Sequence, residues 1–306
     1  MPVQDCKFNA RGLRPRGAGC DMRVYTAPMS RTLMSPAVLA AGLAAGSVAG
    51  SGCAPTCTDG IEDCFEVTQG QYLAFEPETT PDGGRPHLLI YFHGWSSSAQ
   101  TYAKKKWLKN RASERGYLLV LPDGVDETWA HVGSPSRARD ELAFMDEVIT
   151  DIDARWDISE VRAVAGFSQG GSMAWDLACY RGQDYSAFIP ASGAFWKPLP
   201  PECDSPVNLR HTHGTEDTVI PLEGRSLGGP EQGNVWEALQ ILRDVNGCEE
   251  TPDSSETDGE VTCDIWSSCS SGQELRICLH GGKHRLPDGH LSQALDWVEG
   301  VSPTGD

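Results

Sequence analysis

The chain is poor in positive charge. Its 306 residues contain 25 lysines and arginines against 43 aspartates and glutamates, a formal net charge of −18 at pH 7. Nucleic-acid binding needs clustered lysine and arginine side chains that displace the counterions of the phosphates. The composition therefore argues against nucleic acid as a partner and indicates a well-solvated protein.

Long apolar runs and metal-binding patterns are also missing. No segment after residue 52 approaches the roughly 20 apolar residues that a membrane-spanning helix needs. The cysteines form no paired CxxC, and none has histidines placed to complete a tetrahedral zinc shell. We therefore expect no metal, and the chemistry inferred below requires no organic cofactor.

Cysteine itself is abundant, with 11 residues in an otherwise ordinary globular composition. A reducing cytosol rarely leaves a use for so many cysteines, so the count predicts disulfide bonds and an oxidising compartment. Free buried thiols are the alternative.

The first 52 residues predict an export signal. One arginine lies between Met29 and Met34, and residues 36–50 form a run of small and apolar residues that leads to Cys53. These are the parts of a signal peptide. Residues 1–28 do not fit such a signal and are interpreted as an over-extended start, with a disordered basic arm as the alternative. We expect an exported protein, extracellular or periplasmic, with a leader over residues 1–52 and one domain over residues 53–306.

Strand-length apolar runs alternate with helical patterns along the body of the chain, which predicts βαβ units and a mainly parallel sheet. The expected strands are residues 87–92, 117–121, 161–166, 187–190, 207–212 and 274–279. The expected helices are residues 99–110, 140–155, 170–181, 234–245 and 291–299. The acidic, serine-rich stretch 249–260 is expected to be a solvated loop.

One serine lies in the pattern GxSxG. Residues 166–171 read GFSQGG, with a strand-like run before Ser168 and a helix-like run after it. The flanking glycines permit the tight strand-to-helix turn that lifts a nucleophilic serine above a sheet. We therefore predict that Ser168 is a nucleophile; the alternative is a plain turn with a helix-capping serine.

A nucleophilic serine requires a histidine that takes its proton and an acid that fixes the histidine tautomer. In folds with this serine turn, the chain order is serine, acid, histidine. Residues 213–221 (HGTEDTVIP) directly follow a predicted strand. We choose Asp217 as the acid over Glu216.

The last predicted strand is followed by the segment HGGKH at residues 280–284. Its paired glycines permit a loop that could carry an imidazole to the serine, and we choose His284 as the general base. His280 ends the strand and is equally consistent with a packed histidine, while His290 is expected to begin the terminal helix.

The mechanism also needs two backbone N–H groups that bind the oxyanion of the tetrahedral intermediate. The N–H of Gln169, the residue after the nucleophile, would be one of them. The turn His93-Gly94-Trp95 follows an early predicted strand, and the N–H of Trp95 would be the second.

Four segments resemble the polyhydroxybutyrate depolymerase and feruloyl esterase (LpqC-type) family: residues 93–95 (HGW), 166–171, 213–221 and 281–287 (GGKHRLP). The likeness covers roughly residues 57–298. It implies an α/β-hydrolase fold, with a mainly parallel sheet and helices on both faces. One departure is Arg285-Leu286, where many members carry Thr or Ser and then Trp beside the catalytic histidine.

Residues 191–201 and 221–225 resemble substrate-side loops of one bacterial branch of this family. They contribute three candidates for lining the substrate cleft, for each of which packing or a salt bridge is an equal alternative: Trp196, Glu223 and Arg225.

We expect a serine esterase that hydrolyses carboxylic esters, small or polymeric, through an acyl-enzyme, like the polyhydroxybutyrate or hydroxyalkanoate oligomer depolymerases. A feruloyl or acetyl-xylan esterase that acts on plant polysaccharide is the alternative. A third possibility is a catalytically idle surface lipoprotein that binds a polymer or partner.

Nine cysteines remain when those of the leader are set aside, so one must differ from the rest. The expected disulfides are Cys57–Cys64, Cys179–Cys203, Cys248–Cys269 and Cys263–Cys278, the last two being one choice among three possible pairings. Cys53 is left over, where a bacterial lipoprotein would be cleaved and acylated. Simple cleavage after Ala49 is the alternative, and membrane attachment is expected only through such an anchor.

Overall fold

The computed structural model describes residues 57, 63–81 and 84–302. The predicted leader, including Cys53, lies outside the described residues. In the described part, no helix has both the length and the hydropathy of a membrane span.

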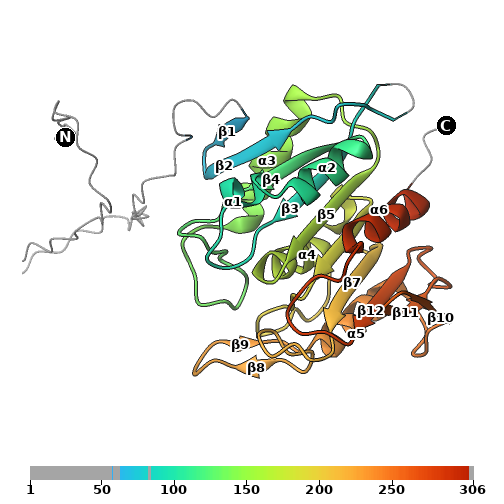
Figure 1. Cartoon of the computed structure of the whole chain (residues 1–306). Coiled ribbons are helices and arrows are strands. Elements are labelled where there is room, and N and C mark those ends of the chain that lie inside the picture. Colours follow the sequence, from blue (N-terminus) through green and yellow to red (C-terminus); the bar gives the residue numbers. More distant parts are fainter. Residues whose placement is uncertain (1–56, 58–62, 82–83, 303–306) are drawn as a thin grey trace, which may run out of the picture. The chain divides into compact units, whose positions relative to one another are not determined.

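A ten-stranded sheet forms the centre of the protein (Figure 1). Its order is β1-β2-β4-β3-β5-β6-β7-β12-β11-β10. The bounds are β1 (Cys64–Val67), β2 (Gly70–Phe75), β3 (His87–Phe92), β4 (Tyr117–Pro122), β5 (Arg162–Phe167), β6 (Ala187–Ala191), β7 (Leu209–Gly214), β10 (Ser254–Asp258), β11 (Val261–Trp266) and β12 (Leu275–His280). A separate two-stranded sheet pairs β8 (Arg225–Ser226) with β9 (Glu231–Gln232).

The six central strands, from β4 to β12, run parallel to one another, whereas the strands at both ends of the sheet pair antiparallel. Strands β3 and β4 contain the buried apolar runs Leu88–Phe92 and Tyr117–Leu121, as expected for a sheet covered on both faces, whereas β7 (LRHTHG) is buried with polar side chains. The predicted parallel sheet is therefore confirmed.

Helices cover both faces of this sheet (Figure 1). On one face lie α3 (Glu141–Arg155), α4 (Gln169–Tyr180) and α5 (Val235–Asn246), which share a core with side chains such as Ile90 and Val164. On the other face lie α1 (Ala99–Ala103), α2 (Lys106–Glu114) and α6 (His290–Val301), packed on side chains such as Leu89 and Ala163. The alternation of neighbouring strand residues between the two cores follows from the two-residue period of a strand. This is the α/β-hydrolase fold that the sequence predicted.

Two sequence-based expectations were wrong in detail. The single helix expected over residues 99–110 is two helices, because Lys105 between them has an extended backbone (φ −79°, ψ 95°). The stretch 249–260, expected to be a loop, contains β10, all of whose residues are exposed. Strand β10 forms because its backbone pairs with β11, even though it buries no side chain.

Within the described residues there are four disulfide bonds: Cys57–Cys64, Cys179–Cys203, Cys248–Cys269 and Cys263–Cys278. These are the four pairs expected from the sequence. They are the bonds of a protein that folds in an oxidising compartment, in agreement with the predicted export.

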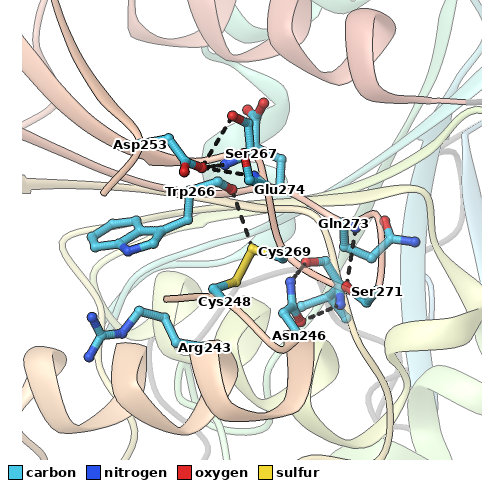
Figure 2. The surroundings of a disulfide bond; sticks show 12 residues. Arg243, Asn246, Cys248, Asp253, Trp266, Ser267, Cys269, Ser271, Gln273 and Glu274 are labelled. Atoms are coloured by element: carbon cyan, nitrogen blue, oxygen red, sulfur yellow. Dashed lines mark hydrogen bonds between the residues drawn. A yellow bond between two sulfur atoms is a disulfide. The ribbon is translucent and has the colours of Figure 1, made fainter. Parts of the chain in front are cut away.

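The Cys248–Cys269 bond joins the end of α5 to the loop that follows β11 (Figure 2). The carboxylate of Asp253, which lies just before β10, accepts the backbone N–H groups of two residues of this loop, Ser267 at 2.7 Å and Ser268 at 2.8 Å. The disulfide and these hydrogen bonds fix the loop that leads into β12, the strand before His284.

Candidate active site

The parallel strands direct the predicted site residues to one place. Because the carboxyl ends of parallel strands meet at the same edge of a sheet, the loops after β3, β5, β7 and β12 leave from that edge. These four loops carry, in chain order, His93 to Trp95, Ser168, Asp217 and His284. The topology therefore explains how residues 116 positions apart, such as Ser168 and His284, come into contact.

Ser168 occupies a sharp turn between β5 and α4. Its φ of 61° and ψ of −125° lie in a region that residues other than glycine rarely adopt. The turn is held because the Ser168 N–H donates to the carbonyl of Ala191 at 2.9 Å. Such strain persists only where the surrounding structure enforces it, and it often marks a functional residue.

Two glycines beside Ser168 make this turn possible. A Cβ atom on Gly166 would lie 2.1 Å from the carbonyl oxygen of Gly170, and one on Gly170 would lie 2.1 Å from the carbonyl oxygen of Phe92. Any side chain at either position would push the helix away from the strands. The GxSxG pattern thus reflects how closely α4 approaches the sheet.

Ser168, His284 and Asp217 form a continuous hydrogen-bonded chain. The Nε2 atom of His284 lies 2.9 Å from Oγ of Ser168, and its Nδ1 atom lies 2.6 Å from Oδ2 of Asp217. The His284 ring also packs against Phe167, with 4.8 Å between ring centroids. The arrangement suits proton transfer from the serine to a histidine whose orientation is fixed by an acid.

The Asp217 side chain is fully buried. Its Oδ1 atom accepts the backbone N–H groups of Val219 at 2.8 Å and Ile220 at 2.9 Å. Burial alone would raise the pKa of Asp217, but the hydrogen bonds from His284 and from these backbone groups outweigh it and lower the pKa below its ordinary value. The carboxylate is therefore charged at neutral pH. Glu216, the alternative in the sequence, is exposed.

Two further histidines support the acid loop from inside the core. The indole N–H of Trp175 donates to Nδ1 of His211 at 3.2 Å, and the Nε2 atom of His211 lies 2.8 Å from Nδ1 of His213. The Nε2 atom of His213 then lies 2.8 Å from the carbonyl oxygen of Ile220 and 3.5 Å from Oδ2 of Asp217.

The direction of this hydrogen-bonded chain follows from its first member. An indole N–H can only donate, so Nδ1 of His211 accepts and its Nε2 carries the proton. Nδ1 of His213 accepts the hydrogen bond from this Nε2–H group, and Nε2 of His213 donates to the carbonyl oxygen of Ile220 in the acid loop. Burial lowers the pKa of both histidines, so both are neutral at neutral pH. The contact between His213 and Asp217 is therefore polar rather than ionic.

A similar argument fixes the turn expected to supply an oxyanion donor. The backbone N–H of Gly124 donates to Nε2 of His93 at 3.0 Å, so the neutral ring carries its proton on Nδ1, which donates to the carbonyl of Gly94 at 2.9 Å. Burial lowers the pKa of His93, which keeps the ring neutral. In a trans peptide the C=O and N–H groups point in opposite directions, so the N–H of Trp95 points away from His93.

A cleft of about 660 Å³, named here the serine cleft, contains Ser168, His284, Gln169 and Trp95. The other predicted cleft residues differ in position: Trp196 and Arg225 line the serine cleft, whereas Glu223 is exposed and is not among its lining residues. Arg225 is held by hydrogen bonds to Gln232 at 2.9 Å and to the carbonyl of Thr218 at 3.1 Å.

Most of the apolar lining of the serine cleft was not predicted from the sequence. It includes Tyr102, Phe167, Val219, Ile220 and Leu227. Val219 and Ile220 lie two and three residues after the predicted acid, and that proximity was the only sequence signal for this lining. The buried pair His211 and His213 had a signal of its own, because residues two apart on a strand share a face.

His280 and His290 lie near the site but take no part in the hydrogen-bonded chain of Ser168, His284 and Asp217. His280 is buried, and its Nδ1 accepts the N–H of Gly282 at 3.1 Å. His290 is buried at the start of α6, as expected. Among the described residues no group of histidine, cysteine or acidic side chains has a geometry suited to a metal ion.

Comparison with known proteins agrees with this fold. The chain is 27% identical to feruloyl esterase C of Emericella nidulans over 278 residues, which covers 85% of this chain and 94% of that protein. It is 25% identical to feruloyl esterase D of Neurospora crassa, over 87% of this chain and 91% of that protein. An acetyl xylan esterase from Aspergillus awamori has a similar fold, with a TM-score of 0.56 over 75% of this chain and 93% of that one at 11% identity.

These relatives are named for feruloyl and acetyl xylan esters, and the polyhydroxybutyrate side of the sequence resemblance stays a prediction. The model of the Esterase family, described as "Putative esterase", matches residues 71–238, more than half of the chain. The chain therefore belongs to the esterase family and is an α/β-hydrolase.

Proposed function

We propose that this esterase hydrolyses esters of aromatic acids, feruloyl esters in particular, with Ser168 as nucleophile, His284 as general base and Asp217 as the acid that orients it. The observation that carries the proposal is the hydrogen-bonded chain of these three side chains at an aromatic cleft.

The reaction would proceed in two halves. Ser168 Oγ attacks the ester carbonyl carbon while His284 Nε2 takes the hydroxyl proton, and the resulting imidazolium is stabilised by Asp217. The tetrahedral intermediate collapses, the C–O bond to the alcohol breaks, and His284 returns the proton to the leaving oxygen. Water then attacks the acyl-enzyme by the same route and releases the acid and the free serine.

The intermediate's oxyanion would be bound by the backbone N–H groups of Gln169 and Trp95. Gln169 is the first residue of α4, so its N–H has no partner within the helix. The N–H of Trp95 and the carbonyl of Gly94 belong to the same peptide group. The hydrogen bond from Nδ1 of His93 to that carbonyl would hold the peptide, and with it the N–H donor, in a fixed orientation.

The preference for an aromatic acyl group rests on the lining of the serine cleft. Trp95, Tyr102, Phe167 and Trp196 all border it, and Trp95 is 74% exposed. Planar aromatic rings pack favourably against one another in stacked or edge-on arrangements. A feruloyl group, which carries an aromatic ring, suits this lining better than the aliphatic acyl group of a hydroxyalkanoate does. The names of the curated relatives point to the same substrate class.

A fluorophosphonate probe and a substrate panel test the proposal. The probe should label the protein once, at Ser168, and Ser168→Ala should lose both labelling and hydrolysis of methyl ferulate, because loss of a nucleophile costs several orders of magnitude in rate. Methyl ferulate should be cleaved faster than a hydroxybutyrate oligomer. Hydrolysis that survives Ser168→Ala would contradict the assignment of the nucleophile. Faster cleavage of the hydroxybutyrate oligomer would contradict the proposed preference for an aromatic acyl group.

We also infer export with an anchor at Cys53, a residue outside the described part of the chain. Mass spectrometry of the mature N-terminus tests this inference. A diacylglyceryl group on Cys53 would support the anchor, whereas an unmodified chain that begins at Gly50 would contradict it and indicate free secretion.

A further inference from the structure

A second cavity adjoins the serine cleft. It measures about 690 Å³ and shares Tyr102, Phe167 and His284 with that cleft, but Ser168 does not line it. Its remaining walls come from the α1–α2 region, from Tyr91 of β3, and from the segment that runs from the end of β12 into the first turn of α6. We name it the histidine cavity, since His284 lies at its junction with the serine cleft.

The histidine cavity is bordered by the most basic segment of an acidic chain. Residues 104–111 (KKKWLKNR) hold five basic and no acidic residues, including four of the six lysines that follow residue 52. Such a concentration stands out against the formal net charge of −18. A local excess of positive charge attracts anions.

Most cations that line the cavity are already neutralised. Arg111 pairs with Glu114 at 3.0 Å, and Arg285 donates to Glu260 at 3.0 Å. Lys105 differs, because its ammonium group makes no ion pair with any described residue and lies 4.8 Å from the centroid of the Tyr102 ring. Lys105 is thus the cation of this cavity that is available to a ligand.

The histidine cavity also presents an aromatic surface among polar groups. Trp107 is 44% exposed, and its ring is held edge-on against the buried Tyr91, with 6.1 Å between centroids and an interplanar angle of 79°. Asn110 and Ser292 line the same cavity. A fixed indole face beside hydrogen-bonding side chains suits a ring that is apolar on its faces and hydroxylated at its edges, as a sugar is.

The chemistry of the proposed reaction says which half of the ester would enter this cavity. The histidine that takes the serine proton returns it to the oxygen of the leaving alcohol, so the alcohol lies next to that histidine. In the proposed reaction the aromatic serine cleft holds the acyl group, and the histidine cavity begins at His284. The alcohol half therefore extends into the histidine cavity.

We propose that the histidine cavity binds the alcohol half of the substrate and that this half is a saccharide bearing a carboxylate, with Trp107 under a sugar ring and Lys105 beside the carboxylate. This inference rests on the proposed function for its orientation, because it takes His284 to protonate the leaving alcohol. It defines the substrate class as feruloyl esters of uronate-containing saccharides.

Kinetics with two matched substrates tests the proposal. The first is the ferulate ester of a neutral oligosaccharide, and the second is the same ester with one uronate residue. The wild-type enzyme should have the higher kcat/KM on the uronate ester. Lys105→Gln should reduce this preference roughly three- to tenfold, as expected for loss of one partly exposed charge pair worth about 1 kcal/mol. Raising the salt concentration should reduce the wild-type preference as well.

Lys109→Gln is the matched control. Lys109 belongs to the same basic segment, but its ammonium group lies over the ring of Phe75 at 3.8 Å and lines neither the serine cleft nor the histidine cavity. The Lys109→Gln variant should keep the wild-type preference for the uronate ester. Equal wild-type rates on the two saccharide esters, or equal losses in the two lysine variants, would overturn the proposal.

A binding experiment separates this proposal from the proposed function. Free trigalacturonate should bind Ser168→Ala protein more tightly than a neutral xylotriose does, and Lys105→Gln in that background should weaken its binding while Lys109→Gln should not. Trp107→Ala should weaken binding of both saccharides. This pattern would support the cavity assignment even if methyl ferulate were not a substrate, and absence of trigalacturonate binding would overturn the assignment even if methyl ferulate were hydrolysed.

Discussion

The Nδ1 atom of His284 lies 2.6 Å from Oδ2 of Asp217, a carboxylate with no exposed surface. The other Asp217 oxygen accepts two backbone N–H groups, so the carboxylate is fixed and can receive only the Nδ1–H tautomer of His284. That tautomer leaves Nε2 free to accept the serine proton. The geometry therefore makes Asp217 a test of the whole proposed mechanism.

Asp217→Asn should lower kcat by about 10³- to 10⁴-fold, because an amide can donate to Nδ1 and stabilise the wrong histidine tautomer. Steady-state kinetics with methyl ferulate measures the loss. Glu216→Gln, at the neighbouring position, is the control. Because Glu216 is exposed, the kcat of this variant should stay close to that of the wild type. A strong defect in Glu216→Gln together with an active Asp217→Asn would reverse the assignment of the acid.

His213→Leu should lower kcat about tenfold, the effect of one lost hydrogen bond of about 1.4 kcal/mol on transition-state stabilisation. The physical reason is that His213 supports the acid loop through the Ile220 carbonyl and does not line the serine cleft. KM for methyl ferulate should therefore change little. A variant in which KM rises while kcat is unchanged would show that His213 acts on substrate binding instead.

Two glycine substitutions should have opposite effects on stability. Gly170→Ala places a methyl carbon 2.1 Å from the carbonyl oxygen of Phe92, which is far closer than van der Waals contact. This substitution should therefore destabilise the fold strongly. Gly300→Ala, in α6, meets no atom within 4 Å and should stabilise by up to about 1 kcal/mol, because alanine restricts the unfolded chain and favours helix. Urea unfolding of both variants measures the difference. Equal midpoints would contradict the close approach of α4 to the sheet.

Stability should fall in mild acid because of His290. Burial lowers the pKa of His290 to about 3, whereas the ordinary value in an unfolded chain is about 6.5. Between these values the unfolded state binds a proton that the folded state does not, so the free energy of unfolding falls as the pH drops from about 6.5. The loss at pH 5 relative to pH 8 is about 2 kcal/mol from this residue.

His290→Gln removes that proton-binding group from both states. Its urea midpoint should therefore change less between pH 8 and pH 5 than the wild-type midpoint does. Parallel pH dependences of the two proteins would show that the histidine is charged in the folded state, which would contradict its burial.

The sequence predicted the central strands and the positions of the site residues because these depend on local pattern and on chain order. Strand β3 was expected at residues 87–92 and has those bounds, since its residues are a continuous apolar run. Ser168, Asp217 and His284 each follow a strand of the parallel part of the sheet, and a parallel sheet brings such positions to one edge. Topology therefore turned three separate motifs into one expected site.

The helix expected over residues 99–110 shows where a local pattern was insufficient. Tyr102 and Leu108 both face the sheet, yet six residues correspond to roughly 240° of rotation along one uninterrupted helix. The break at Lys105 resets the phase so that both side chains are buried. Only packing against the sheet reveals this requirement.

The polar strand β10 and the lining of the serine cleft were not predictable for a different reason. The residues of β10 have no apolar alternation, and the strand exists because β11 offers it a pairing edge. The cleft side chains come from several distant loops, and their meeting depends on how those loops fold over the sheet. Neither relationship is encoded within a short window of sequence.

Strand β10 also has a consequence for how copies of the protein meet one another. It is the last strand of the sheet, so one of its edges has no neighbouring strand among the described residues, and such an edge can recruit a strand from another molecule. Glu256 and Asp258 are both exposed on this strand. Glu256 lies 3.5 Å from Arg276, but Asp258 makes no ion pair with a described residue, so two copies aligned edge to edge would bring acidic side chains together. This repulsion opposes intermolecular sheet growth along the edge of β10.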